Sequence, residues 1–132
     1  NYSKTVLIEA GTMIDMARRQ ILPAVQSYTG ALAGTVAAKK AVAPQIACGY
    51  EISQIEKLST LTDQIAKCTK KKKKALVDVK ACSDALEESA AIRDTVISKM
   101  AALRTVADEA ETLTAEQYWP FPTYGELLFG VR

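Results

Sequence analysis

The sequence predicts an all-α fold, in which an antiparallel bundle of about three long helices is followed by an extended tail and a short terminal helix. Apolar residues recur at alternating steps of three and four, the spacing that places them on one stripe of a helix. No Gly or Pro occurs between Gly49 and Pro120. One helix over that distance, roughly 100 Å, would have too little partner helix to bury its stripe. The chain must therefore turn in between, and we expect residues 1–132 to form a single domain.

The first helix is predicted over residues 2–42. Pro23 lies inside its pattern and should kink the helix without ending it, because proline lacks a backbone donor. Residues 20–38 carry no charge but are rich in alanine and include several polar side chains. We therefore expect a buried alanine-rich helix and not a membrane span, with Gly30 and Gly34 allowing close approach of a neighbouring helix. The stripe consists of Leu7, Ala10, Ile14, Ala17, Ile21, Ala24, Tyr28 and Leu32.

Two further helices are predicted over residues 45–82 and 84–113. The second helix should begin just after Pro44, because proline disfavours helix at the preceding residue and suits a first helical turn. The stripe of the second helix consists of Ile55, Leu58, Thr62, Ile65, Thr69, Leu76 and Val79. The stripe of the third consists of Ala90, Ile97, Met100, Leu103, Ala107 and Ala110.

Two places compete for the turn between the second and third helices. One is the lysine run at residues 70–74, since five successive lysines point in all directions and at least one must lie near the core stripe. The other is residues 82–85, where Asp84 and Glu87 form an acidic capping box that opens a new helix. We prefer the second place, because it gives three helices of more comparable length.

The tail at residues 114–132 differs from the rest of the chain. Five of the eight aromatic residues and two of the four prolines lie within residues 118–129. Pro120 and Pro122 favour extended backbone at the residue before each of them. The tail should therefore contain an extended aromatic segment.

Capping patterns predict two short helical turns in the tail. Thr114 and Gln117 are a capping pair for one helical turn. Thr123 and Glu126 form an S/T-x-x-E capping box in front of an apolar triplet, which predicts the short terminal helix.

We expect the tail to provide the chain's docking or packing side chains. Two interpretations stay open: these side chains close the end of their own bundle, or they dock onto another domain or subunit. The candidate residues are Tyr118, Trp119, Phe121, Tyr124, Leu128 and Phe129.

The composition argues against chemistry within the chain. There is no histidine, which removes the commonest general base and metal ligand. The carboxylates at residues 84–88 and 108–111 offer no convincing facing pair, and no Gly-rich phosphate loop is present. We therefore expect no catalytic residue, no cofactor site and no metal site here.

Charge and cysteine content limit the functional classes and the cellular compartments that suit this chain. The 17 basic and 15 acidic residues nearly balance, which argues against a dedicated nucleic-acid binder. The five lysines Lys70, Lys71, Lys72, Lys73 and Lys74 are expected to form a solvated helix face or bundle tip. Three cysteines without a paired short spacing indicate a reducing compartment and small buried or half-buried side chains. The chain does not begin with Met, and we expect it to be part of a longer protein.

Three stretches carry a resemblance to a known family. The ending YWPFPTYGELLF at residues 118–129 resembles the C-terminal ending of type III glutamine synthetases. The stretch YSKTVLIEAGTMIDMARRQILPAV at residues 2–25 is similar to the family segment that follows the catalytic domain. The stretch IRDTVISKMAALRTVADEAE at residues 92–111 is similar to the family's last long helix. Ser98 stands where the family often has proline, and the lysine run at residues 70–74 lies in a variable region.

The resemblance implies a non-catalytic C-terminal helical domain of a larger enzyme. That parent would join glutamate and ammonia to make glutamine, with ATP and Mg or Mn, through a γ-glutamyl phosphate. It would be a cytoplasmic bacterial homo-oligomer, expected to be a dodecamer, with its ligands upstream on the catalytic domain. The partners of this chain would be that domain and neighbouring subunits, not nucleic acid or a membrane. The alternatives are a free-standing helical interaction module and, less favoured, a basic helical protein that binds nucleic acid or membranes.

Overall fold

The computed structural model describes residues 2–82 and 84–122 of the chain. Every regular element within these two ranges is helical, and three helical rods pack together. The prediction of an all-α bundle of about three long helices is confirmed. The elements are α1 (Tyr2–Met16), η1 (Ala17–Ile21), α2 (Leu22–Val42), α3 (Gly49–Lys80), α4 (Ala85–Ala91), η2 (Ile92–Val96), α5 (Ile97–Leu113) and η3 (Glu116–Tyr118).

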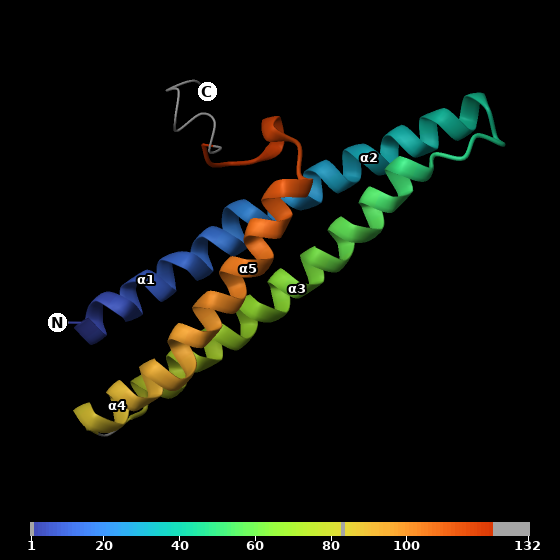
Figure 1. The fold of residues 1–132 in the computed structure, drawn as a ribbon. Helices are drawn as coiled ribbons and strands as arrows, with labels where there is room; N and C mark the ends of the chain where they lie inside the picture. Colours follow the sequence, from blue (N-terminus) through green and yellow to red (C-terminus); the bar gives the residue numbers. More distant parts are fainter. Residues whose placement is uncertain (1, 83, 123–132) are drawn as a thin grey trace.

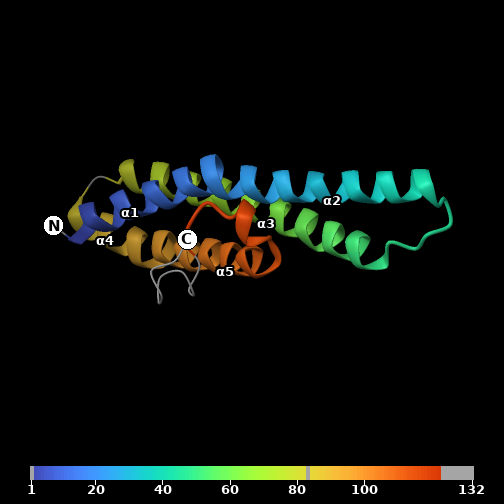
Figure 2. The same cartoon turned by 90° about the horizontal axis from the view of Figure 1, so that it is seen from above.

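The three rods form an elongated molecule. The first rod runs without a break through α1, η1 and α2, and α3 returns antiparallel beside it (Figure 1). The third rod, α4 to α5, then runs back along α3 and ends well before the α2–α3 connection (Figures 1 and 2). The outer half of α2 and the beginning of α3 therefore project as a two-helix arm.

The core of the bundle is divided into two clusters. The first core cluster lies where α5 ends against the middle of the other two rods. The second lies toward the chain's N-terminal end. The first core cluster consists of Ala17, Ile21, Val25, Leu58, Leu61, Ile65, Leu103 and Ala110. The second core cluster consists of Val6, Ala10, Ala75, Val79, Ile92 and Val96.

Pro23 is accommodated by a wide turn immediately before it. Residues Ala17–Ile21 form a π-helical turn, and the Leu22 N–H donates to the carbonyl of Ala17, five residues back. A π turn inserts one extra residue into a helix, so the disturbance that proline causes is taken up one turn earlier. The helix continues through Pro23, as the sequence predicted.

A second π turn occupies Ile92–Val96, where the Ile97 N–H donates to the carbonyl of Ile92. It was not predicted, and the buried positions around it are Ile92 and Val96. Ile97, which we had placed on the core stripe, is instead 39% exposed. Ser98 is the second residue after this turn, as Pro23 is after the first, so both sites share one local geometry.

Ser98→Pro should therefore change stability little. Proline in a regular helix interior costs about 3 kcal/mol or more, but a site placed like Pro23 should lose less than about 1 kcal/mol. The matched control is Ser59→Pro, since Ser59 is equally exposed but lies in the uninterrupted helix α3. Urea denaturation of both variants measures the difference. Equal losses would contradict the equivalence of the two π turns.

The connection between α2 and α3 is longer than predicted. The expected helix start near residue 45 is wrong: α3 begins at Gly49, and Pro44 lies in a turn in which the Ile46 N–H donates to the carbonyl of Ala43. Cys48, the residue before α3, adopts a left-handed conformation with φ 50°. A left-handed non-glycine residue cannot continue a right-handed helix, so helix formation starts only after it.

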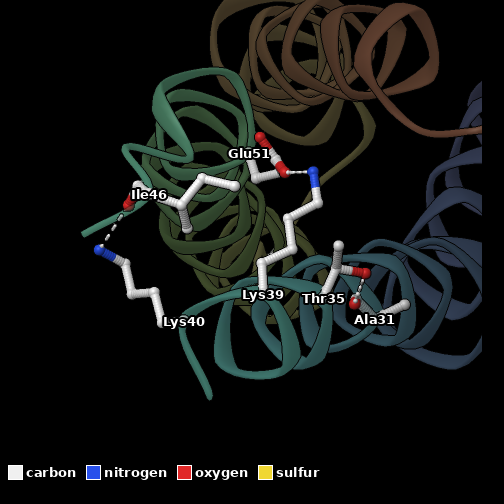
Figure 3. Close-up of polar contacts among 6 residues, drawn as sticks. All are labelled: Ala31, Thr35, Lys39, Lys40, Ile46 and Glu51. Carbon is white, nitrogen blue, oxygen red and sulfur yellow. Dashed lines mark hydrogen bonds and ion pairs between the residues drawn. The ribbon is translucent and has the colours of Figure 1, made fainter. Parts of the chain in front are cut away.

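An ion pair ties the two helices of the arm together near its tip. Lys39 Nζ in α2 donates to Glu51 Oε2 in the first turn of α3, and Lys40 Nζ donates to the carbonyl of Ile46 at 3.3 Å (Figure 3). The hydrogen bond to Lys39 lowers the pKa of Glu51, and the same bond to Glu51 raises the pKa of Lys39. The carboxylate also lies in the first turn of a helix, where a negative charge is favoured.

The chain turns at the second of the two predicted places. Helix α3 passes through the lysine run and ends at Lys80, and α4 begins at Ala85. The Glu87 N–H donates to Asp84 Oδ1 at 2.7 Å, so Asp84 caps the new helix as the sequence predicted. The short polar side chain satisfies a backbone donor that a helix start leaves unpaired.

The outer half of α2 is not buried, which corrects one expectation. Val25 is its only buried residue, and a Cβ added at Gly30 or Gly34 would meet nothing within 4 Å. No neighbouring helix of the described chain uses these small residues, because α5 ends before it reaches them. None of the described helices is both long enough and apolar enough to cross a membrane.

Candidate functional site

The aromatic segment that follows α5 packs on the chain's own bundle. Trp119 and Phe121 lie against the first core cluster, and their rings meet edge to face with centroids 6.2 Å apart. Tyr118 lies against Tyr28 of α2, with ring centroids 5.3 Å apart. Of the two interpretations of the tail, packing on the bundle therefore describes these three side chains. Tyr124, Leu128 and Phe129 fall outside the described residues, as does the predicted terminal helix.

The backbone of this segment explains how it reaches the bundle. Trp119 is extended, with φ −78° and ψ 128°, as expected for a residue before proline. The helical turn Glu116–Tyr118 before it has no side-chain cap, so the predicted pair of Thr114 and Gln117 does not form. The Thr114 hydroxyl is instead buried without a hydrogen-bond partner in the described part of the chain. The turn begins at Glu116 with Ala115 in the N-cap position, so Thr114 lies one residue too early to cap it.

Trp119 and Phe121 also form one wall of an open cavity between the first and third rods. The cavity has a volume of about 310 Å³. Its apolar floor includes Met13, Ile21 and Leu103, and Arg104, Asp108 and Glu111 lie among its lining residues. A second cavity of about 520 Å³ continues along the same seam and shares Arg104 and Asp108. The seam between α1 and α5 is thus open along much of its length.

One lysine of the run at residues 70–74 lies inside the bundle and not on its surface. Lys70, Lys71, Lys73 and Lys74 are exposed, but Lys72 is 0% exposed and has the largest fully buried side chain of the described chain. The sequence predicted a solvated helix face or bundle tip for all five lysines. Its Nζ lies inside the bundle, 3.1 Å from the Sδ atom of Met13. The signal in the sequence was the position of Lys72, three residues after Thr69 and seven before Val79 on the predicted stripe.

In the described part of the chain, no carboxylate forms an ion pair with the Lys72 ammonium. Burial, followed by the positive charge of Arg104, lowers the pKa of Lys72 to about 8. Elsewhere in the described part of the chain, Lys39 forms an ion pair with Glu51 and Arg93 forms one with Asp94. A thioether is only a weak acceptor, so the Met13 contact compensates little of the lost hydration.

The carboxylates and cysteines of the described residues form no metal-binding cluster. Within the described residues, no three Asp, Glu, Cys or His side chains come together in a way that could hold a metal ion. The three cysteines are free thiols: Cys48 is buried, while Cys68 and Cys82 are half-buried. Burial is the first cause that raises the pKa of the Cys82 thiol, and the carboxylates of Glu87 and Glu88 add to it.

Comparison with known proteins relates the chain to one family. A family model described as the glutamine synthetase C-terminal domain matches residues 1–40. A protein of Butyrivibrio fibrisolvens named glutamine synthetase is 33% identical over 132 residues, covering 100% of this chain and 19% of that protein. The resemblance to glutamine synthetases is confirmed. A type-3 glutamine synthetase of Dictyostelium discoideum is 26% identical over 135 residues, covering 97% of this chain and 18% of that protein. No solved structure gives a significant match.

The similarity to these relatives extends along the whole chain. Because the similarity to glutamine synthetases covers the full chain, it includes the second and third rods and the aromatic tail as well as the first rod. The chain spans less than a fifth of the length of both relatives.

Proposed function

We propose that this chain is the C-terminal helical domain of a type III glutamine synthetase and that its role in the whole protein is structural. The observation that carries the proposal is the full-length similarity of the chain to glutamine synthetases of which it spans 19% and 18%. The match of residues 1–40 to the family's C-terminal domain supports the position of the chain within its parent.

The parent enzyme would join glutamate and ammonia to form glutamine in the bacterial cytoplasm. It would use ATP and Mg or Mn, and the reaction would pass through γ-glutamyl phosphate. The residues that bind these groups would lie in parts of the parent outside this chain. The chain alone would then be inactive, and its partners would be the catalytic domain and neighbouring subunits, which we expect to assemble as a dodecamer.

Exposed apolar side chains on the bundle support a contact role. Several large apolar residues lie on the surface, and three of them, Val42, Ile46 and Tyr50, gather at the tip of the two-helix arm, with exposures of 88%, 41% and 69%. Apolar groups clustered at a surface are typical of protein contact sites. The arm tip is therefore our candidate for a contact within the assembled parent.

Val42→Asp in the full-length protein tests this contact. A charge placed in an apolar interface should raise the dissociation constant of the assembly at least about tenfold, because the carboxylate would lose its hydration. Analytical ultracentrifugation measures the change. Leu86→Asp is the matched control, since Leu86 is similarly exposed, at 83%, but lies at the opposite end of the bundle. Unchanged assembly in Val42→Asp would remove the arm tip from the proposal.

The coding sequence in front of Asn1 tests whether the chain is part of a glutamine synthetase. A glutamine synthetase catalytic domain is expected there, and a start codon directly before Asn1 would contradict the proposal. A free-standing interaction module would then be favoured. Salt-dependent binding of this chain to DNA or anionic vesicles would favour the basic alternative, with Lys70, Lys71, Lys73 and Lys74 as the exposed lysines of the run.

A further inference from the structure

The core is interrupted at the level of Lys72. The first core cluster contains Ile65 from α3, and the second contains Ala75 and Val79. Lys72 lies between these residues on the same buried face of α3. Its side chain is also fully buried, but it belongs to neither of the two hydrophobic clusters. The layer where the two clusters should join therefore contains an amine in place of an aliphatic side chain.

The surroundings of this amine offer little to a positive charge. From the first rod, Met13 places its thioether 3.1 Å from Nζ, while the charged residues of α1, Lys4, Glu9 and Asp15, are exposed. From the third rod, the charged group that acts on Lys72 is another cation, Arg104. On α3 itself, the neighbours Lys71 and Lys73 are cations as well. Among the described residues, no hydrogen bond or ion pair joins Lys72 to a carboxylate.

Closing the bundle around Lys72 thus favours the neutral amine. A buried ammonium without a charged partner loses its hydration and regains little, whereas a neutral amine can be enclosed by aliphatic and thioether groups. Helix α1 contributes to this enclosure, because the Sδ atom of its Met13 lies 3.1 Å from the Lys72 Nζ.

We propose that Lys72 is a proton-linked switch in the bundle, which releases its proton when α1 packs over it and loosens the α1–α3 contact when it is protonated. The lowered pKa of about 8, against an ordinary value of 10.5, fixes the range in which the switch acts. The folded state binds fewer protons than the unfolded state between pH 8 and 10.5, so stability rises with pH across this window. Below about pH 8 both states are protonated, and the folding constant is lowered about 300-fold relative to an unperturbed lysine.

NMR titration of the 132-residue chain tests the switch directly. With ¹³C-labelled lysine, the Lys72 ε-carbon should titrate near pH 8. With methyl-labelled methionine, the Met13 methyl signal should follow the same midpoint as Lys72. Met16, which lines the cavity of about 310 Å³, is the internal control. Its methyl signal should not follow the titration of Lys72. A Lys72 titration near pH 10.5 would overturn the proposal, whether or not any variant folds.

Denaturation at several pH values gives a second test. Lys72→Met should abolish the rise in stability between pH 8 and 10.5 and increase the folding constant at pH 7 by up to about 300-fold. Lys71→Met and Lys73→Met are matched controls, because these residues are exposed, and both should keep the wild-type rise. A Lys72→Met variant with the same rise would contradict the assignment to this residue.

Discussion

Leu58→Ala should lower the free energy of unfolding by about 3–4 kcal/mol. Leu58 is 0% exposed and lies in the first core cluster, where side chains of all three rods meet. Alanine would remove buried methyl groups and leave a cavity that the surrounding helices can fill only in part. Urea denaturation followed by circular dichroism measures the loss.

Leu86→Ala is the matched control for this substitution. Leu86 is 83% exposed on α4, so the same change of side chain should alter stability by less than about 0.5 kcal/mol. If Leu58→Ala cost no more than Leu86→Ala, the first core cluster would not be the main packing region of the bundle.

Trp119→Ala should lower the free energy of unfolding by about 2–3 kcal/mol, below the range for a fully buried tryptophan because this ring is half-buried. The loss has two parts. The indole covers the first core cluster, and its edge-to-face contact with Phe121 is worth about 1 kcal/mol beyond burial. Because the substitution removes the only tryptophan, circular dichroism should follow unfolding.

Two comparisons make the Trp119 prediction specific. Tyr50→Ala is a control, because Tyr50 is a large aromatic residue that is 69% exposed. A double-mutant cycle with Phe121→Ala should return a coupling of about 0.5–1.5 kcal/mol. An unchanged denaturation midpoint in Trp119→Ala would show that the aromatic segment does not stabilise this bundle. A larger loss of assembly in the full-length protein than in the isolated chain would point to an additional contact with another domain.

Periodicity and capping determined much of the fold from the sequence. Ala10, Ile14, Ala17 and Ile21 were placed on the buried stripe and are buried, because three- and four-residue spacing directly describes a helix face. The turn near Asp84 was found because a capping side chain has a strict local geometry. The resemblance to glutamine synthetases was carried by the tail and two helical stretches, and the comparisons confirm that resemblance.

Features that depend on tertiary packing could not be read from the sequence. The π turn at Ile92–Val96 contains no proline or glycine, so nothing local distinguishes it from an ordinary helical turn. The left-handed Cys48 carries no preference for that conformation, and only the folded connection imposes it. Both features shift an element by a few residues, which is why Ile97 and the start of α3 were misplaced.

The candidate site was predicted in part. The composition of the aromatic segment suits its own bundle and another domain equally, and the structure adds that Trp119 and Phe121 pack against the first core cluster. The burial of Lys72 follows from its position on the α3 stripe. A lysine at such a position usually directs its head to solvent, so the enclosure by Met13 had to come from the structure.

The central claim is that this chain stabilises or assembles a glutamine synthetase without supplying its chemistry. The most direct measurement compares the full-length protein with a version that ends before Asn1, recording the mass of the assembly, its melting temperature and glutamine formation together. We predict that the truncated protein has a smaller assembly or a lower melting temperature. A truncated protein of unchanged assembly and unchanged melting temperature that no longer forms glutamine would contradict the account, because the chemistry would then require this domain.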